Sequence, residues 1–462
     1  MRKKFNDQIP LMNPTVKHSH AAEYKAVDQI LQANPLIFDM VHMDLTENVK
    51  KDNAGANGMT SEQVLKAAII KQREGFSYAE LAFHLLDSTT YRNFCLIGIG
   101  HKGFSSAALC GNIKSISPET WEMINCQNVC YAQEEKLERG REVRIDCTVV
   151  PTNIHDPRDS NQLYDCVRVL ARILTSVNAR FIDQATLIFT DHTSRAKRRL
   201  LAIMNAKGKK GRKEPYKDLI KVTRKTVGYS QNAVSRLSQT EFNDPVMALA
   251  INGIVQDLNH FIDLAEKVID QTERRVLKGE SVPASEKVLS IFEPHTDIII
   301  KDRRDPLFGH KICLTGGKSN LILDCTILEG NPADSTLVED MLDRQKDIYD
   351  RYPLKAALDG GFASKENLKI AKGKEGVKDV CFAKRRGIKQ EDMCRSEYVY
   401  KRLRRFRAGI ESGISWLKRC FGLRLCNWKG FASFKSYIWS SIVSANLFTM
   451  ARLKLNQNAT QA

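Results

Sequence analysis

The order of strand-like and helical segments limits the possible folds of this 462-residue chain more than any other feature of its sequence. Residues 142–150 (EVRIDCTVV) are apolar and β-branched, which is typical of a buried strand. Two further strand-like segments, 311–315 and 321–328, are joined through a Gly-Gly pair and predict a hairpin. An apolar helix at 337–342 and a strand at 354–358 follow. A hairpin followed by a helix and another strand predicts an α/β fold with a mixed sheet.

A long, mostly helical stretch separates the first strand from the hairpin. Apolar residues repeat at steps of three and four over 163–177 and again over 251–269, so we expect two helices that pack against each other. The sequence therefore predicts an RNase H-like mixed sheet within a domain at 136–455. A large, mainly helical insertion at 156–290 interrupts its first hairpin, and a short tail, 456–462, follows the domain.

Residues 1–135 are predicted to form an N-terminal helical domain. Within it, Gly75 separates two helical segments, and Ser77 with Glu80 three residues later predicts a capped start for the second helix. The pattern resembles a helix-turn-helix and has two interpretations: a domain that binds DNA ends, or a small helical bundle that supports the next domain.

Charge points to a polyanionic partner. The 71 Lys and Arg residues outnumber the 54 Asp and Glu residues, which gives a formal net charge of +17. Between residues 195 and 217 the basic residues are opposed by Glu214 alone. Such a run is either a solvated surface or a DNA-contacting segment, and we predict a DNA-contacting loop. The basic residues expected to bind DNA there are Arg198, Arg199, Lys209, Lys210 and Arg212.

Several classes of protein are disfavoured by the sequence. The 12 cysteines form no Cys-x-x-Cys pair, which argues against a zinc module and fits a reducing cytoplasm. The basic N-terminus has no apolar segment behind it and does not resemble a signal peptide. The apolar stretch at 437–448 contains serines and an asparagine, so we interpret it as a buried amphipathic helix and expect no membrane association.

Two aspartates of the predicted sheet are candidate metal ligands. Asp146 lies in the middle of the first strand, where a carboxylate must be paired, hydrogen-bonded or metal-bound. Asp359 follows the strand at 354–358 and precedes a Gly-Gly pair, at the strand end where α/β proteins build their sites. The alternatives are an ion pair with Arg144 or Arg141 for the first and an ordinary turn residue for the second.

Glu411 comes with informative neighbours. On a helix predicted from about residue 403 to 421, Arg407, Glu411 and Lys418 project within about 60° of one another, apart from the apolar stripe. The alternative is an exposed salt bridge between Arg407 and Glu411, worth a few tenths of a kcal/mol. Three shared carboxylates suit two Mg²⁺ ions, and nearby cations suit the negative phosphodiester transition state.

The chain resembles a DDE transposase of bacterial insertion sequences, similar to the ISNCY-like group. The resemblance runs from about residue 60 to the C-terminal helices. The segments that carry it are RIDCTVVPTNIHDPRDSNQLYDCVRVL at 144–170, SIFEPHTD at 290–297, GHK at 309–311, EGNPADS at 329–335, ALDGGF at 357–362 and RAGIESGISWLK at 407–418.

The resemblance implies an RNase H-like fold and a Mg²⁺-dependent triad, with Mn²⁺ as a substitute, made by Asp146, Asp359 and Glu411. It implies binding of terminal inverted repeats and of target double-stranded DNA, and we expect a homodimer on DNA in a nucleoid-associated, cytoplasmic protein. Related families carry a Tyr-Arg-Glu-Lys signature, which this chain matches at Arg407, Glu411 and Lys418. Arg404 holds the Tyr position as a further DNA-contact candidate, and Tyr400 is a candidate substitute.

Other carboxylates and other functions remain open from the sequence. Asp324 in the second hairpin strand and Asp191 after an apolar run are alternative ligands, and His155 is a candidate contact to DNA. The predicted reaction is cleavage at transposon ends followed by joining of the 3′-hydroxyl to target DNA. The alternatives are an RNase H-like nuclease or resolvase without strand transfer, and an inactive transposase-derived DNA-binding protein.

Overall fold

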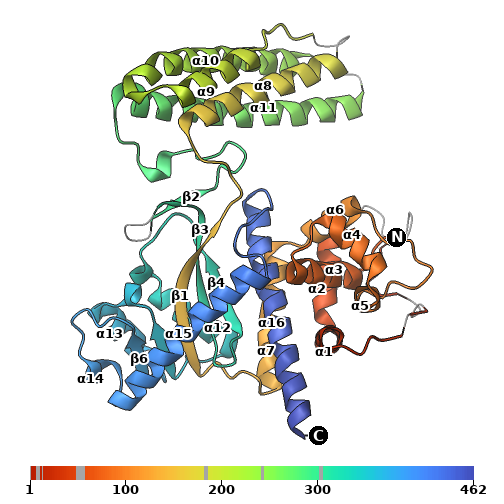
Figure 1. Ribbon diagram of the computed structural model, residues 1–462, viewed down its shortest axis with the longest axis vertical. Coiled ribbons are helices and arrows are strands. Elements are labelled where there is room, and N and C mark those ends of the chain that lie inside the picture. Colours follow the sequence, from red (N-terminus) through yellow and green to blue (C-terminus); the bar gives the residue numbers. More distant parts are fainter. Residues whose placement is uncertain are drawn as a thin grey trace. The chain divides into compact units, whose positions relative to one another are not determined.

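The computed structural model divides the chain into two compact units (Figure 1). The first unit combines residues 1–153 and 299–462, and the second unit contains residues 154–298. The residues described are 2–6, 11, 12, 14–47, 58–181, 186–240, 244–300 and 305–461, without the side chains of 209, 460 and 461.

The first unit is built on a mixed sheet. Its strands are β1 (Glu142–Pro151), β3 (Leu307–Gly316), β4 (Ile322–Ile327), β5 (Lys355–Leu358) and β6 (Asp379–Phe382), and the short β2 (Asp297–Ile299) falls at the boundary between the two units in the chain. In the order β4-β3-β1-β5-β6, the first three strands are antiparallel, while β5 is parallel to β1 and β6 is parallel to β5. This is the RNase H-like arrangement, and it confirms the predicted fold class.

Helices cover both faces of the sheet. On one face α15 (Glu397–Cys420) contacts β1, β5 and β6, and Figure 1 shows it crossing the front of the sheet. On the other face α7 (Pro118–Glu134), α12 (Val338–Tyr349) and α16 (Phe431–Gln461) contact β4. The smaller elements around the sheet are η3 (Asp334–Thr336), η4 (Gly360–Phe362), α13 (Lys365–Gly373) and α14 (Gln390–Met393).

A row of polar residues on β1 holds α15 in place. Glu142, Arg144 and Asp146 alternate along the strand and therefore face the same side of the sheet. Glu142 accepts hydrogen bonds from Arg402 and from Lys355, and these bonds lower its pKa against the opposing effect of burial.

Arg144 is the middle residue of this row. It donates to the carbonyl oxygen of Phe406 at 3.1 Å and to Asn320 Oδ1 at 2.6 Å, and its guanidinium lies over the Phe406 ring. This buried side chain passes so close to Gly409 that a Cβ there would collide with it.

Helix α16 is buried on almost all sides over residues 434–448, in contrast to the amphipathic helix that we predict there. Its residues 434–448 include the buried polar side chains Ser436, Ser440, Ser441, Ser444 and Asn446. Asn446 accepts from the Ile322 N–H at 2.9 Å and donates to the Ile322 carbonyl at 2.7 Å, so it completes the hydrogen bonds of an edge strand. Within the described part of the chain, no helix is both long and apolar enough to span a lipid bilayer.

Six helices precede α7, and two of them, α1 and α3, pack against α16 within the described part of the chain. The six are α1 (Ser19–Gln32), α2 (Leu36–Thr46), α3 (Ser61–Glu74), α4 (Tyr78–Asp87), α5 (Thr89–Phe94) and α6 (Ser106–Lys114). The capping box predicted at Ser77 and Glu80 is present, and Gly75 ends α3 in the left-handed conformation. Residues 61–72 of α3 are all buried, so only α4 of this helix pair presents an exposed face.

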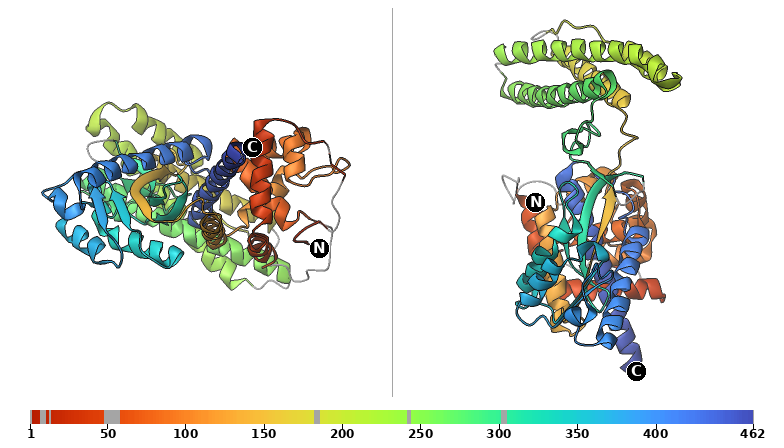
Figure 2. Two further views of the ribbon diagram at one scale, coloured as in Figure 1. Left: turned by 90° about the horizontal axis from the view of Figure 1, so that it is seen from below. Right: turned by 90° about the vertical axis from the view of Figure 1, so that its left-hand side faces the viewer.

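In its described residues, the second unit is a bundle of four helices. These are α8 (Asp159–Arg180), α9 (Thr193–Asn205), α10 (Gly208–Gln239) and α11 (Pro245–Thr272), followed by the π-helical turn η1 (Glu273–Lys278) and the short η2 (Ala284–Glu286). The predicted pairing of the helices around 163–177 and 251–269 is confirmed by the contacts between α8 and α11. The right-hand view of Figure 2 shows the helices of this bundle lying close together.

The basic run at 195–217 is helical, and the predicted loop is wrong. It forms α9 and the first turns of α10, which are separated at Gly208 with φ of 74°. Ala, Leu, Lys and Arg dominate this run and are good helix formers, and the helix is interrupted only at 206–208, where Ala206 and Lys207 are extended and Gly208 has a positive φ.

The two glycines of α15 provide a matched test of the contact between β1 and α15. We expect Gly413→Ala to raise the free energy of unfolding by about 0.5–1 kcal/mol, because nothing lies within 4 Å of the added Cβ. Gly409→Ala should lower it by about 1–2 kcal/mol, since the anchored Arg144 must give up a hydrogen bond. Denaturant unfolding measures both values, and equal stabilisation by the two substitutions would contradict the close contact.

Candidate active site

The register of the sheet brings Asp146 and Asp359 together. In the parallel pair of β1 and β5, Ile145 lies opposite Leu358, so the residues that follow them, Asp146 and Asp359, are neighbours at the end of β5. The Asp146 side chain is 15% exposed and also accepts from the Cys147 N–H at 2.8 Å, while the Asp359 side chain is 40% exposed. Two carboxylates therefore share one edge of the sheet.

Arg407 connects these two aspartates to Glu411. Its Nη1 lies 3.0 Å from Asp359 Oδ1 and 3.8 Å from Asp146 Oδ2, and its Nη2 donates to Glu411 Oε1 at 2.7 Å. The predicted alternative of a local salt bridge between Arg407 and Glu411 is present, but the same guanidinium also reaches both strands. All three predicted catalytic carboxylates thus converge on one cation.

Two further side chains enclose the turn after Asp359. A Cβ on Gly360 would meet the Lys384 side chain at 2.8 Å, and a Cβ on Gly361 would meet Asp334. Asp334 is paired with the buried Lys311 of β3, which also donates to the Pro332 carbonyl at 2.6 Å. A side chain at either glycine would therefore collide with a neighbouring side chain.

Asp334 and Lys311 were not predicted as neighbours of this turn, and Lys311, opposite Val149, points to the sheet face away from Asp146. The sequence contains one signal that points to this pair: a lysine in a strand that is expected to be buried needs an acidic partner. The partner follows the hairpin in the stretch EGNPADS.

The donor set suits a hard divalent cation. Mg²⁺ prefers carboxylate oxygens, and three carboxylates already surround a single positive charge here. Among the described residues, no three acidic, histidine or cysteine side chains are close enough together to hold a metal ion directly. The guanidinium of Arg407 provides the positive charge between the carboxylates in this arrangement.

The other predicted residues of α15 lie in different environments. Lys418 lies in the last turn of the helix and is partly exposed, and Arg404 is exposed. Tyr400 is only 4% exposed, and its hydroxyl donates to the Phe382 carbonyl at 3.5 Å. Tyr400 is therefore a core residue, and the suggestion that it replaces the signature tyrosine is wrong.

The predicted DNA-binding residues of the second unit lie on α9 and α10. Arg199 is paired with Asp218, as is Arg195 at 2.5 Å. Hydrogen bonds from Arg195 and then Arg199 lower the pKa of Asp218 against the opposing effect of burial. Arg198, Lys210 and Arg212 have exposed side chains, whereas the side chain of Lys209 lies outside the described part of the chain.

The alternative residues are engaged elsewhere. Asp324 lies opposite Thr315, which lies opposite Ile145, so Asp324 points to the sheet face away from Asp146. There Arg344 donates to both of its carboxylate oxygens, at 2.6 and 2.7 Å.

Two alternatives belong to the second unit. The Asp191 carboxylate accepts a hydrogen bond from the N–H of Thr193, the first residue of α9. His155 Nε2 lies 2.9 Å from Asp165 Oδ2. Neither therefore belongs to the sheet that carries Asp146.

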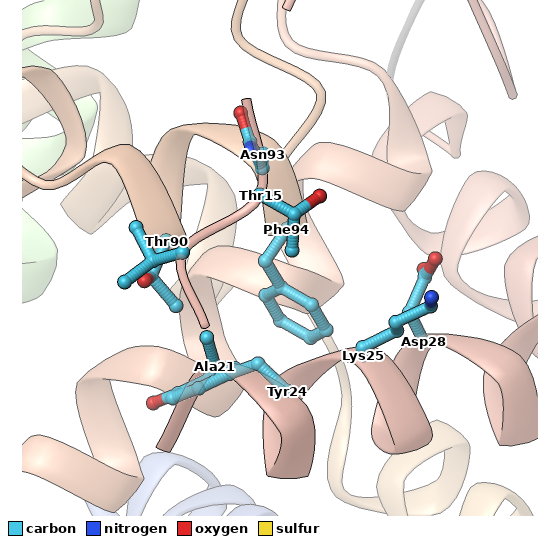
Figure 3. A pocket seen from close by; sticks show the side chains of 9 residues that line it. Thr15, Ala21, Tyr24, Lys25, Asp28, Thr90, Asn93 and Phe94 are labelled. Carbon is cyan, nitrogen blue, oxygen red and sulfur yellow. The ribbon is translucent and has the colours of Figure 1, made fainter. Parts of the chain in front are cut away.

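A pocket among the N-terminal helices offers a different chemistry. It encloses about 160 Å³ and is lined by Tyr24, Lys25, Asp28, Phe94 and their neighbours (Figure 3). Its one carboxylate, Asp28, is 2.5 Å from the fully buried Lys66. A single neutralised carboxylate does not provide a two-metal site.

Residues 302–447 match the family model of the transposase DDE domain. The matched stretch contains Asp359, Arg407 and Glu411, whereas Asp146 lies before it. No curated protein and no solved structure matches the chain. The match supports a function in DNA transposition and a transposase of the DDE type.

Substitution of Asp324 tests whether this residue stabilises the fold without taking part in the reaction assigned to Asp146, Asp359 and Glu411. We expect Asp324→Asn to lower the free energy of unfolding by about 1–3 kcal/mol, because it breaks a buried pair with Arg344. DNA cleavage per folded molecule should stay within about threefold of the original protein, since Asp324 lies on the opposite sheet face. Thermal unfolding and a cleavage assay on terminal-repeat DNA measure these effects, and loss of cleavage in a folded variant would return Asp324 to the candidate ligands.

Proposed function

We propose that this protein is an insertion-sequence transposase that cuts phosphodiester bonds at transposon ends and joins the freed 3′-hydroxyl to target DNA. The observation that carries the proposal is the convergence of Asp146, Asp359 and Glu411 on Arg407, within a sheet of RNase H-like order. The match of residues 302–447 to transposase DDE domains supports it independently.

Each side chain of the site has a proposed role. Asp146 and Asp359 would hold two Mg²⁺ ions, or Mn²⁺ in their place, and Glu411 would complete the second site. When bound, the two ions would activate water or a 3′-hydroxyl and stabilise the leaving oxygen. Arg407 and Lys418 would bind the scissile and flanking phosphates, whose charge increases in the transition state. Arg404, exposed on the same helix, would contact the DNA backbone.

We propose that two parts of the chain bind different parts of the DNA. We assign residues 1–135 to the recognition of terminal repeats and the insertion at 156–290 to duplex binding. Exposed cations of α9 and α10 support the second assignment. Because two transposon ends must be cut together, we propose that a homodimer assembles on DNA.

Isosteric exchange of the carboxylates tests the chemistry. We expect Asp359→Asn and Glu411→Gln each to slow cleavage of terminal-repeat DNA in Mg²⁺ by about a thousandfold or more, since each removes a metal ligand charge. Asp343→Asn is the matched control, because this exposed carboxylate of α12 pairs with Lys374. It should cleave at the original rate.

A pre-cut transposon end distinguishes the proposed reaction from its alternatives. With Mg²⁺ and target DNA, the transposase yields a joined product, and an RNase H-like nuclease or resolvase yields none. An inactive DNA-binding protein would leave both substrates unchanged. Full activity of Asp359→Asn would rule out the triad mechanism whichever products form.

The salt dependence of duplex binding tests the insertion. We expect the combined exchange Arg198→Gln, Lys210→Gln and Arg212→Gln to reduce the slope of log affinity against log salt by about 2–3, because each lost phosphate contact contributes about 0.9. Arg224→Gln on α10 is the control, since Arg224 pairs with Glu273 at 2.7 Å. If the triple variant kept the slope of the original protein, the duplex would bind to a surface other than that of α9 and α10.

A further inference from the structure

We infer that Arg407 is an internal counter-ion that takes the place of the metal ions in the free protein, so that metal binding is coupled to DNA binding. The inference rests on the proposed function. It begins from charge: Asp146, Asp359 and Glu411 bring three negative charges within salt-bridge distance of one guanidinium. Like charges this close repel one another strongly unless a cation lies between them.

Arg407 is placed by the fold to provide that cation. Its side chain is 15% exposed, and it comes from the α15 turn that follows Arg402 and Phe406, both of which are held by β1. By contrast, the Glu411 side chain is 59% exposed. An exposed arginine that served only to bind DNA would not need to contact three carboxylates, one each from β1, the turn after β5 and α15.

The carboxylates leave one donor of the same guanidinium unsatisfied. Arg407 Nε is buried and has no hydrogen-bond partner among the described residues, while Nη1 and Nη2 contact the carboxylates. A guanidinium can bind a phosphate with two parallel N–H groups. A DNA phosphate next to the site would therefore draw Arg407 away and free carboxylate oxygens for a cation.

Coupling follows from this competition. Without DNA, Arg407 opposes metal binding because both cations need the same oxygens. With DNA, the phosphate satisfies the guanidinium, so each ligand increases the affinity for the other by the same factor. The free protein therefore holds a charge-balanced site in which metal-dependent cutting awaits a bound DNA strand.

Metal titration of the full chain tests the inference without measuring catalysis. We expect Arg407→Gln to bind Mn²⁺ about tenfold or more tightly than the original protein in the absence of DNA, because a competing unit charge is gone. Arg405→Gln removes the same charge from an exposed position of the same helix, to which no contact with the described strands is assigned, and should change Mn²⁺ affinity less than about twofold. Calorimetry or electron paramagnetic resonance of Mn²⁺ gives the affinities.

Two further measurements complete the experiment. A short DNA duplex should raise the Mn²⁺ affinity of the original protein by about fivefold or more and that of Arg407→Gln by less than about twofold. Mn²⁺ should also raise the melting temperature of Arg407→Gln more than that of the original protein, which shows that the variant is folded and binds the metal in its folded state.

The possible failures are distinguishable. Equal or weaker Mn²⁺ binding by Arg407→Gln would overturn the counter-ion role and leave the proposed function standing, because arginine would then only support the carboxylates. Unchanged Mn²⁺ binding after a further Asp146→Asn exchange would place the metal elsewhere and overturn both proposals. Absence of Mn²⁺ binding in all variants, with DNA or without it, would do the same.

Discussion

The contact between β1 and α15 determines the geometry of the candidate site. Three alternate residues of the strand each engage the helix: Glu142 binds Arg402, Arg144 binds the backbone at Phe406, and Asp146 lies near Arg407. These contacts fix the position of α15 along its axis and its rotation about that axis, and thereby the position of Glu411. A strand with an apolar outer face would allow the helix to slide, since apolar contacts are not directional.

Sequence reasoning succeeded where local periodicity determines structure. The strands that carry Asp146 and precede Asp359 follow from β-branched apolar segments, and the face shared by Arg407 and Glu411 follows from helical geometry. The face of Asp324 was not predictable, because it depends on the pairing register of three strands.

The errors arose where distant segments meet. The interpretation of the basic run as a loop gave too much weight to glycine, because Gly211 lies within α10 and only 206–208 interrupt the helical run. The pair of Lys311 and Asp334 brings together a strand and a later turn, and the contacts of Arg407 with both aspartates bring together β1, β5 and α15. Local sequence patterns and residue propensities do not predict contacts between distant segments. These contacts are set by the register and order of the strands in the folded sheet.

The burial of α16 has a consequence for how the protein is made. This helix supplies the partner of α3, α1 and α7, yet Gln72 of α3 and Tyr437 of α16, which are hydrogen-bonded, stand 365 residues apart in the chain. During synthesis the N-terminal helices are finished long before their central partner leaves the ribosome. Contacts of such long range close late and slowly, so an early-terminated product would expose an unfilled apolar core to chaperones and proteases.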